Sequence, residues 1–315
     1  MKKTITYILL LLGCIGGADA QFLVTPKEGE ATKIEGNVTF SKDEASGSWS
    51  LGESFDSSLE LSKIEKISLY KDDELKIGDY YYSDGTWSTT LDSSKTPIGV
   101  VFYVGDPSVS DEALKAAHPG CVHGLVAGLK QVKCEWQEDY SGFDDEAGGI
   151  TVGEWIEENT DYVSIATRSE SMTSVFNKIM GYNNTMGIDE FNDSDYGFDY
   201  EVLVGSKLPS AIDATAPEGT SGWYIPSIKE VSLLCSGNIE GNIGDLGYEE
   251  TPDTVNMTLL NSKIAEIDGA QELNGVYWSS TEYSVSQVHA VQFANGLVIQ
   301  VSKGGSYLLR PVLAF

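Results

Sequence analysis

The segment His118-Pro119-Gly120-Cys121-Val122-His123 brings two imidazoles and a thiol within six residues. These groups bind Zn²⁺, and a Cys-His pair is also the centre of many nucleophilic sites. A structural zinc site needs four ligands, and the only other histidine in the chain is His289. Pro-Gly between the candidates indicates a turn that begins a helix or strand. We therefore interpret these side chains as structural and predict no metal site and no cofactor.

Carboxylates are the second group that could do chemistry. The run from Asp189 to Asp195 offers hard oxygen ligands for Ca²⁺, but its spacing does not match the helix-loop-helix calcium signature. The chain holds 48 Asp and Glu against 20 Lys and Arg, so acidic clusters arise by chance. Carboxylate pairs for glycoside hydrolysis are recognised only by their separation in space. No phosphate-binding glycine loop or Gly-x-Ser-x-Gly elbow occurs either, so these residues give no signature of a known enzyme chemistry and we predict that the chain is not an enzyme.

The first twenty residues have the plan of a secretory signal peptide. Two lysines precede an apolar run from Ile5 to Ile15, which is shorter than the roughly 20 residues of a membrane-spanning helix. Small residues at 18–20 follow, so we expect the mature chain to begin at Gln21 and to have no segment inserted in the membrane. A second interpretation takes Cys14 as a lipid-carrying lipoprotein cysteine. Both interpretations export the protein, to the cell surface, to the outer membrane or into the medium.

The charge of the chain restricts its partners. The formal net charge is −28, and the predicted signal peptide carries two Lys and one Asp, which leaves −29 on the mature chain. Such a field repels phosphate backbones and anionic lipids, so we expect no nucleic-acid partner and no membrane-surface partner. Acidity also keeps an exported protein soluble. Because 41% of the residues are apolar, the chain has enough to bury for a folded core.

Three cysteines remain after the predicted cleavage. Disulfides form in exported proteins, and a bridge between Cys121 and Cys134 would close a short loop. Sequence does not establish connectivity, so the bridged and the free forms both stay open. Cys235 lies in the apolar stretch 231–235 and is expected to be a small buried side chain.

The amino-acid composition of the chain changes near residue 75. Residues 21–74 are rich in Glu, Lys and Ser, and alternation at 34–40 and 59–61 indicates a few strands, either a small β module or a stalk. Residues 75–315 are expected to form the main domain. There we predict a hairpin over 80–88, a central strand over 98–104, and short helices over 152–158, 174–180, 228–235 and 255–267. Residues 139–149 and 189–199 are interpreted as long irregular loops.

The last forty residues give the clearest secondary-structure signals of the chain. Asn295-Gly296 joins two apolar-bearing runs, His289–Ala294 and Leu297–Ser302, which is the strongest short-range signal of a β-hairpin. A final strand is expected over Tyr307–Phe315. The predicted fold class is α+β, with short helices, a C-terminal antiparallel hairpin and a small β-rich N-terminal segment.

Three motifs in order resemble a bacterial pattern. They are the stretch Gly222-Trp223-Tyr224-Ile225-Pro226-Ser227 with Glu230, then Tyr277-Trp278-Ser279-Ser280-Thr281-Glu282, then Arg310-Pro311-Val312-Leu313-Ala314-Phe315. Together they resemble the C-type-lectin-like fold of bacterial surface proteins, and more narrowly the variable proteins that retroelements diversify, some of which are pilus tip adhesins. The resemblance covers about residues 77–315. The calcium-dependent sugar-binding motifs of animal C-type lectins are absent.

The resemblance implies that a ligand contacts the segment between the second and third motifs, residues 283–308. A feature of the sequence agrees with this, because the run 297–301 carries apolar residues at both strand parities, so one face cannot cover them all. If Val298 faces inward, the other parity is exposed as a binding patch; the alternative is a strand buried on both faces. The predicted ligand-binding residues are Tyr283, Val285, Gln287, Ala290, Gln292, Leu297, Ile299, Val301 and Leu308.

The expected function is that of an exported cell-surface adhesin or receptor-binding protein of a fimbrium. Its expected partners are a host or bacterial surface protein or glycan, and other pilus subunits. Two alternatives are a structural pilus subunit and a glycan-capture protein, which would need an aromatic cleft such as one around Tyr80–Trp87. Formylglycine-generating enzymes share the broader fold, but they need a cysteine pair near the C-terminus, and no cysteine follows Cys235.

Overall fold

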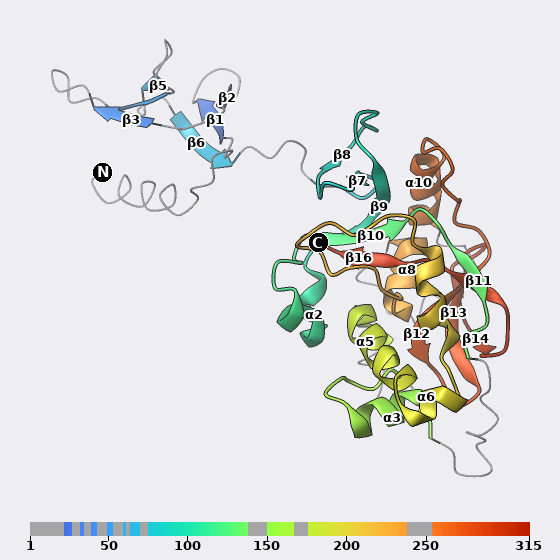
Figure 1. The fold of residues 1–315 in the computed structure, drawn as a ribbon. Helices are drawn as coiled ribbons and strands as arrows, with labels where there is room; N and C mark the ends of the chain where they lie inside the picture. The colour runs from blue at the N-terminus through green and yellow to red at the C-terminus, as the bar shows by residue number, and fades with distance from the viewer. Residues whose placement is uncertain are drawn as a thin grey trace. The chain divides into compact units, whose positions relative to one another are not determined.

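The protein is described by a computed structural model. It describes residues 75–137, 150–166, 176–237 and 254–315 with their side chains, and the backbone of six strands between residues 22 and 69. The chain divides into two compact units, Met1–Glu74 and Leu75–Phe315 (Figure 1). The predicted signal peptide, Cys14 and Gln21 lie outside the described residues. Within the described part, no helix has the length and apolar character needed to cross a membrane.

The first unit consists of two small antiparallel sheets. One has the order β2-β1-β6 and contains β1 (Phe22–Pro26), β2 (Thr32–Ile34) and β6 (Ile64–Leu69). The other has the order β3-β4-β5 and contains β3 (Thr39–Lys42), β4 (Trp49–Gly52) and β5 (Leu59–Glu60). The alternating sequence at 34–40 and 59–61 thus overlaps strands in both sheets, as the period-2 pattern predicts.

The second unit contains two five-stranded sheets. The first has the order β16-β10-β9-β7-β8 and is antiparallel throughout. Its strands are β7 (Tyr80–Tyr82), β8 (Trp87–Ser88), β9 (Pro97–Val104), β10 (Gly124–Gly128) and β16 (Val312–Ala314). Both faces are covered, because Tyr80 and Tyr82 belong to one apolar cluster while Tyr81 belongs to another on the opposite side.

The second sheet has the order β11-β15-β12-β13-β14. Its strands are β11 (Val132–Cys134), β12 (Val276–Glu282), β13 (Gln287–Gln292), β14 (Leu297–Ser302) and β15 (Tyr307–Leu309). This sheet also separates two cores. Val291 faces the larger core, which it shares with the first sheet, and Ala290 faces a second core that contains Trp136 and Trp278. The strand β14 is at the edge of the sheet among the described strands.

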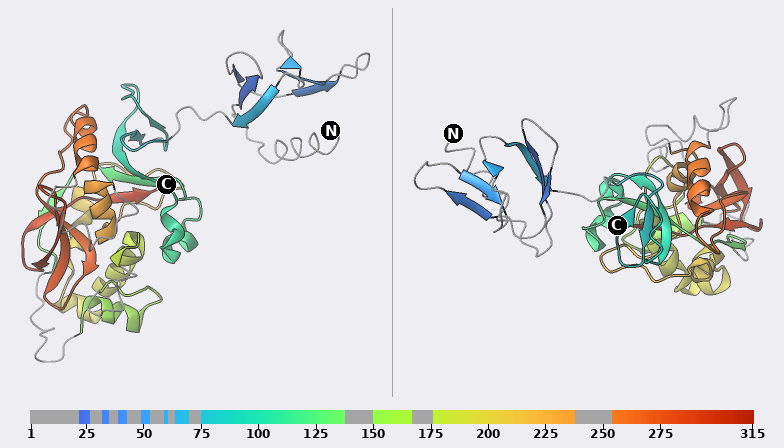
Figure 2. Two further views of the ribbon diagram at one scale, coloured as in Figure 1. Left: turned by 180° about the vertical axis from the view of Figure 1, so that it is seen from behind. Right: turned by 90° about the horizontal axis from the view of Figure 1, so that it is seen from above.

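The second unit also contains helices. The described helices are α2 (Glu112–Ala117), α3 (Val152–Asn159), α5 (Gly181–Asn192), α6 (Asp195–Asp199), α7 (Leu203–Lys207), α8 (Ile228–Ser236) and α10 (Val255–Ile264), with short 3-10 turns at Pro107–Val109 and Leu208–Ala211. Those that pack on the second sheet are α5, α7 and α8. The helix α8 packs on β12 and β13 at the larger core. The helices α3, α5 and α6 lie together at the end of the unit opposite the β7–β8 hairpin (Figure 2).

Two of the predicted helices begin at side-chain caps that the sequence specifies. Thr151 and Glu154 form a capping box at α3, and Ser227 and Glu230 form another at α8. In each box the hydroxyl accepts from the backbone of the glutamate, and the glutamate accepts from the backbone of the capping residue. The predictions of helices over 152–158 and 228–235 are confirmed, and that over 255–267 is confirmed as far as Ile264, where α10 ends.

Other sequence-based expectations are wrong. The interpretation of 189–199 as an irregular loop fails, because α5 and α6 cover most of it. Gly187 and Gly197 lowered the apparent helical tendency there, although both glycines are sites of close packing. The predicted helix over 174–180 is not formed beyond residue 176, and residues 174–175, like the expected loop at 139–149, lie outside the described residues. Cys121 and Cys134 are free thiols in different cores, which removes the bridged alternative.

Candidate functional site

The C-terminal hairpin predicted from Asn295-Gly296 is formed by β13 and β14. The two strands are antiparallel, and the register places Ala290 opposite Ile299 and His289 opposite Gln300. Directly opposed residues point to the same face of an antiparallel pair. Ala290 and Ile299 therefore face one way, together with the residues two positions away from each of them along its strand. His289 and Gln300 face the other way.

This register corrects part of the predicted ligand-binding set. Ile299 and Val301 are half-buried and pack against the second core, so neither forms a fully exposed apolar patch. Ala290 and Val285 are buried, with exposed fractions of 0% and 2%, and neither can touch a ligand. Leu308 is half-buried against the larger core. The strand β14 fits neither sequence-based alternative fully, because its apolar side chains are half-buried on both faces while Gln300 and Ser302 are exposed.

Polar and aromatic side chains gather on the other face of the hairpin, around His289, whose side chain is itself buried at 4% exposure. The ring of His289 lies 4.7 Å from the ring of Phe176 and 5.3 Å from that of Tyr283, measured between centroids. Gln287 is opposed to Ser302 on the same face, and Gln300 and Ser302 are exposed. We call the accessible part of this face the hairpin patch and define it by the half-buried Phe176, Tyr283 and Gln287 and the exposed Gln300 and Ser302, with His289 buried beneath it.

The His289 imidazole beneath the hairpin patch is uncharged at neutral pH. Burial lowers the pKa of His289 to about 4, so the imidazole is neutral at neutral pH. Phe176 and Tyr283 flank this imidazole with half-buried rings, and the glutamine amides beside them can both donate and accept hydrogen bonds. Aromatic faces next to neutral hydrogen-bonding groups suit an uncharged polar ligand.

A buried ion pair fixes both ends of the hairpin patch. The Nζ atom of Lys303 lies 2.5 Å from Oε1 of Glu282, and the two side chains are 1% and 0% exposed. Lys303 directly follows Ser302 and Glu282 directly precedes Tyr283, so the pair joins the two chain segments that carry the patch. Lys303 also donates to Oε1 of Gln137 at 2.8 Å. Its ammonium lies 4.8 Å from the ring centre of Trp136 as well.

The same carboxylate caps a helix. The backbone amides of Val152 and Gly153 donate to Glu282 at 3.2 and 2.8 Å, which places the negative charge at the N-terminus of α3. Helix N-termini favour anions because the amides there are unpaired and the helix dipole is positive. Burial lowers the pKa of Lys303 while Glu282 opposes that change, as expected for an ammonium held by a carboxylate. The hairpin and α3 are thus locked in one arrangement.

The other residues considered for chemistry have structural roles. His118 lies 3.1 Å from the hydroxyl of Tyr182, and the thiol of Cys121 donates to the carbonyl of Ala314 at 3.3 Å. Cys235 is 1% exposed, as expected from its apolar surroundings. Across the described ranges, no group of three or more His, Cys, Asp or Glu side chains is placed to hold a metal ion.

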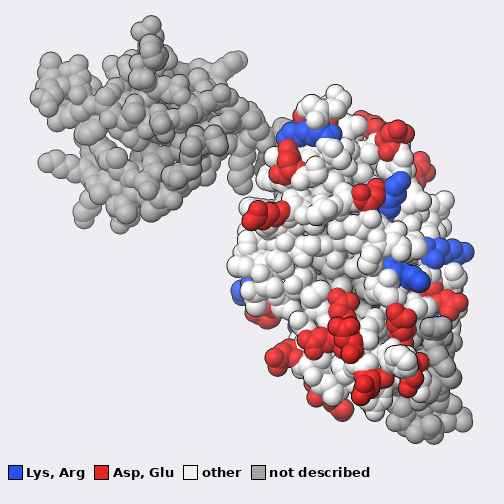
Figure 3. Space-filling view, in the orientation of Figure 1, with Lys and Arg blue, Asp and Glu red and all other residues white. Residues whose placement is uncertain are grey.

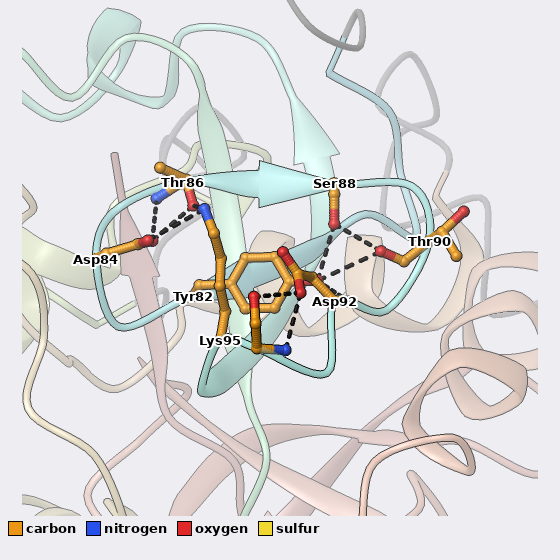
Figure 4. A network of polar contacts seen from close by, with 8 residues as sticks. Tyr82, Asp84, Thr86, Ser88, Thr90, Asp92 and Lys95 are labelled. Atoms are coloured by element: carbon orange, nitrogen blue, oxygen red, sulfur yellow. Dashed lines mark hydrogen bonds and ion pairs between the residues drawn. The ribbon is translucent and has the colours of Figure 1, made fainter.

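The region around Tyr80–Trp87 does not form the aromatic cleft that a glycan-capture protein would need there. Its three tyrosines are buried, and the surface of the hairpin is a polar network (Figure 4). Asp84 pairs with Lys95 at 3.1 Å and accepts from the Thr86 hydroxyl at 2.6 Å. The Tyr82 hydroxyl accepts from the backbone of Asp92 at 2.8 Å. These groups satisfy one another and stiffen the hairpin.

Comparisons with known proteins give the fold a context. No family model matches the chain. A provisionally named fimbrium tip subunit of Bacteroides ovatus, Fim1C, is 26% identical over 248 residues, covering 70% of this chain and 41% of that protein. The crystal structure of a fimbrial protein from Bacteroides ovatus matches with a TM-score of 0.59 and 24% identity, over 94% of this chain and 64% of that chain. The chain thus has the fold of a fimbrial protein and spans less than half the length of the curated relative.

Of the predicted site residues, Tyr283 and Gln287 belong to the hairpin patch, and half-buried Gln292 and Leu297 lie opposite each other at the closed end of the hairpin. Sequence reasoning missed Phe176, His289, Gln300 and the Lys303–Glu282 pair. The pairing of His289 with Gln300 follows from the hairpin register once Asn295-Gly296 is taken as its turn. The contribution of Phe176 depends on a distant part of the chain and leaves no local signal.

Proposed function

We propose that this protein is an exported, pilus-associated surface subunit of the fimbrium-tip type and that its second unit binds a partner. The observation that carries the proposal is the similarity to the Bacteroides ovatus tip subunit over 248 residues. The fold match to a fimbrial protein supports it, because it covers 94% of the chain and so includes strands of both units. Other pilus subunits are then partners of the chain, as the sequence analysis expected.

The contact surface in this proposal is the hairpin patch. It lies in the segment that the resemblance to C-type-lectin-like variable proteins assigns to the ligand, and it presents rings and neutral amides on a rigid support. The Lys303–Glu282 pair holds Ser302 and Tyr283 in place, and such preorganisation lowers the entropic cost of binding. The ligand is a surface protein or glycan that needs no charge from the patch. Diversification by a retroelement stays a prediction.

The buried titratable groups Glu230 and Arg310 hold structural elements together, which supports a binding role without enzymatic activity. Glu230 accepts from Tyr224 and from Ser227, and Arg310 donates to the carbonyls of Gly128 and Gln271. Each of these groups is engaged in holding secondary-structure elements together. A structural pilus subunit is the second candidate, because the tip subunit likeness would also extend to a chain that only connects neighbours.

The first experiment tests pilus association. Residues 21–74 are deleted behind an intact signal peptide in a cell that assembles the pilus, and isolated pili are probed with an antibody to the second unit. Because the second unit is compact by itself, we expect it to stay folded and to be lost from the pili. A full-length Glu218→Gln variant serves as the control. Retention of the truncated chain in pili would contradict the proposed role of the first unit, and absence of the full-length chain from pili would contradict pilus association.

A further inference from the structure

The outer strand of the C-terminal hairpin has one side that no other strand occupies. Among the described strands, β14 is the edge of the second sheet and pairs only with β13. The amide of Lys303 donates to the carbonyl of Ser286 at 3.0 Å, which fixes the alternation of bonds between the two strands. Because bonded and non-bonded pairs alternate along an antiparallel ladder, the backbone N–H and C=O groups of Val298 and Gln300 point away from β13. We call these backbone groups the open edge.

The other sheet edges in the described part of the second unit are short or covered. At the opposite edge of the same sheet, β11 has three residues and carries the exposed Lys133. In the first sheet β8 has two residues, and β16 is covered by Tyr224, whose backbone exchanges hydrogen bonds of 2.8 and 3.0 Å with Val312. The strand β14 has six residues, no charge, no proline and no break in its register. Natural sheets protect their edges by shortness, charge, proline, bulges or a covering segment, so β14 lacks the features that prevent pairing with another chain.

The apolar side chains of β14 are incompletely covered on both faces of the sheet. Val298 packs against the larger core, whereas Ile299 and Val301 pack against the second core, and all three are half-buried. Within a sheet, a neighbouring strand completes such coverage, because opposed side chains on adjacent strands begin only about 5 Å apart. A further strand at the open edge would therefore bury apolar surface on both faces while it pairs the backbone of Val298 and Gln300.

The chemistry of the open edge selects its occupant. Donors and acceptors that alternate along a strand match the backbone of another extended peptide, and a glycan has no such alternation. The strands β13 and β14 contain no Lys, Arg, Asp or Glu, so an uncharged segment can approach without desolvating a charge. A second copy of this chain is disfavoured, because the net charge is −28 and Asp and Glu are spread over much of the second unit on the face that Figure 3 shows. The occupant is therefore a segment of a different protein.

We propose that the open edge binds an extended, uncharged segment of a partner protein, which adds a strand to the second sheet beside β14. This inference rests on the proposed function, because it names the ligand of the hairpin patch as a surface protein and not a glycan. Gln300 belongs to both surfaces, since its side chain is part of the hairpin patch and its backbone is part of the open edge. In strand addition the backbone bonds supply affinity, and side-chain contacts with the neighbouring surface supply specificity.

The test uses residues 21–315 and a synthetic peptide of alternating Thr and Val, whose β-branched side chains favour an extended backbone. A twin peptide is N-methylated at every residue, so it keeps the side chains but donates no backbone hydrogen bond. Calorimetry measures binding, and hydrogen exchange followed by NMR reports on the amides of Val298 and Gln300. We expect the unmodified peptide alone to bind and to slow exchange at both amides. No binding, equal binding of the twin, or binding without protection of these amides would refute the proposal.

Two variants at one position separate the backbone of the open edge from its side chain. Gln300→Pro removes an N–H that points away from β13, a position at which an edge strand tolerates proline. Gln300→Ala removes the side chain and keeps that N–H. We expect the Kd of the peptide to rise about tenfold for Gln300→Pro and to stay unchanged for Gln300→Ala. Equal Kd values for the two variants would overturn the proposal, and the N-methylated twin tests it independently of how well Gln300→Pro folds.

Two further outcomes identify a different occupant. Sedimentation that shows a dimer of the native chain and a monomer of Gln300→Pro would assign the open edge to a second copy and overturn the proposal. A glycan and host-protein array separates this inference from the proposed function. Binding to glycans alone, without binding of the peptide, would overturn strand addition and leave the proposed function intact. Binding to no array member would contradict the proposed function itself.

Discussion

Replacement of Lys303 by Met breaks the buried ion pair beneath the hairpin patch. The ammonium is 1% exposed and lies 2.5 Å from the Glu282 carboxylate, so its loss leaves a buried charge without its cation. Such a loss costs about 3–5 kcal/mol. Because the carboxylate keeps the amides of Val152 and Gly153 at the start of α3, we expect the lower end, about 3 kcal/mol. For a unit of this size that corresponds to a fall in Tm of about 6–12 °C.

Differential scanning calorimetry and urea titration measure this change. The control is Lys95→Met, which removes a pair with Asp84 whose side chains are 34% and 49% exposed and which therefore contributes at most about 1 kcal/mol. Combining Lys303→Met with Glu282→Gln removes both charges, and we expect it to recover part of the loss. A Lys303→Met variant no less stable than Lys95→Met would refute the reasoning, because the pair would then behave as if it were in water.

Three further predictions concern stability and reactivity. Burial raises the pKa of Glu230 from 4.5 to about 7, so the folded state holds a proton that the unfolded state releases between these pH values. This carboxyl should therefore contribute a decline of about 3 kcal/mol in stability from below pH 4.5 to above pH 7, while His289, whose pKa is lowered from 6.5 to about 4, contributes a rise and Asp189, whose pKa is raised to about 6, a further decline. In urea titrations across pH, the stability of the native chain relative to Glu230→Gln should fall by about 3 kcal/mol over this range, and a difference that does not change with pH would contradict the burial of Glu230. Gly153→Ala would place a Cβ atom 2.5 Å from a backbone nitrogen and should lower stability by about 1–3 kcal/mol, whereas Gly120→Ala, with open space around it, should not. Burial raises the pKa of Cys121 and Cys134 to about 11, so a thiol reagent should label the native mature chain only after it is unfolded; rapid labelling of the native protein would contradict this burial.

Local patterns predicted most of the strands and the best-capped helices. Asn295-Gly296 located the C-terminal hairpin, and the Ser227–Glu230 capping box located α8, because both signals act within a few residues. The helices α5 and α6 escaped prediction. Their glycines are disfavoured in isolated helices, and only contacts with Ile156 and with the end of α5 explain why glycine is needed at 187 and 197.

The candidate site was predicted only in part, because its face and its buried partners depend on contacts between distant segments of the chain. The apolar run 297–301 beside Asn295-Gly296 gave the correct strand but not which face is exposed, since that depends on what packs against the second core. The partners of Lys303 are Glu282, 21 residues away, and Gln137, 166 residues away, so no spacing rule reveals them. Aromatic residues near 80–82 suggested a cleft but are buried in the first sheet.

The central claim is that the hairpin patch binds a surface ligand. The most direct measurement is a glycan and host-protein array probed with residues 21–315, beside a Tyr283→Ala, Gln300→Ala variant and a Val255→Ala, Glu272→Ala control. These positions are at least partly exposed, so the variants should fold, unlike Asp substitutions at Ile299 or Val301 against the core. We predict that the native chain and the control bind the same array member and that the patch variant loses it. Equal binding by all three, or binding by none, would contradict the claim.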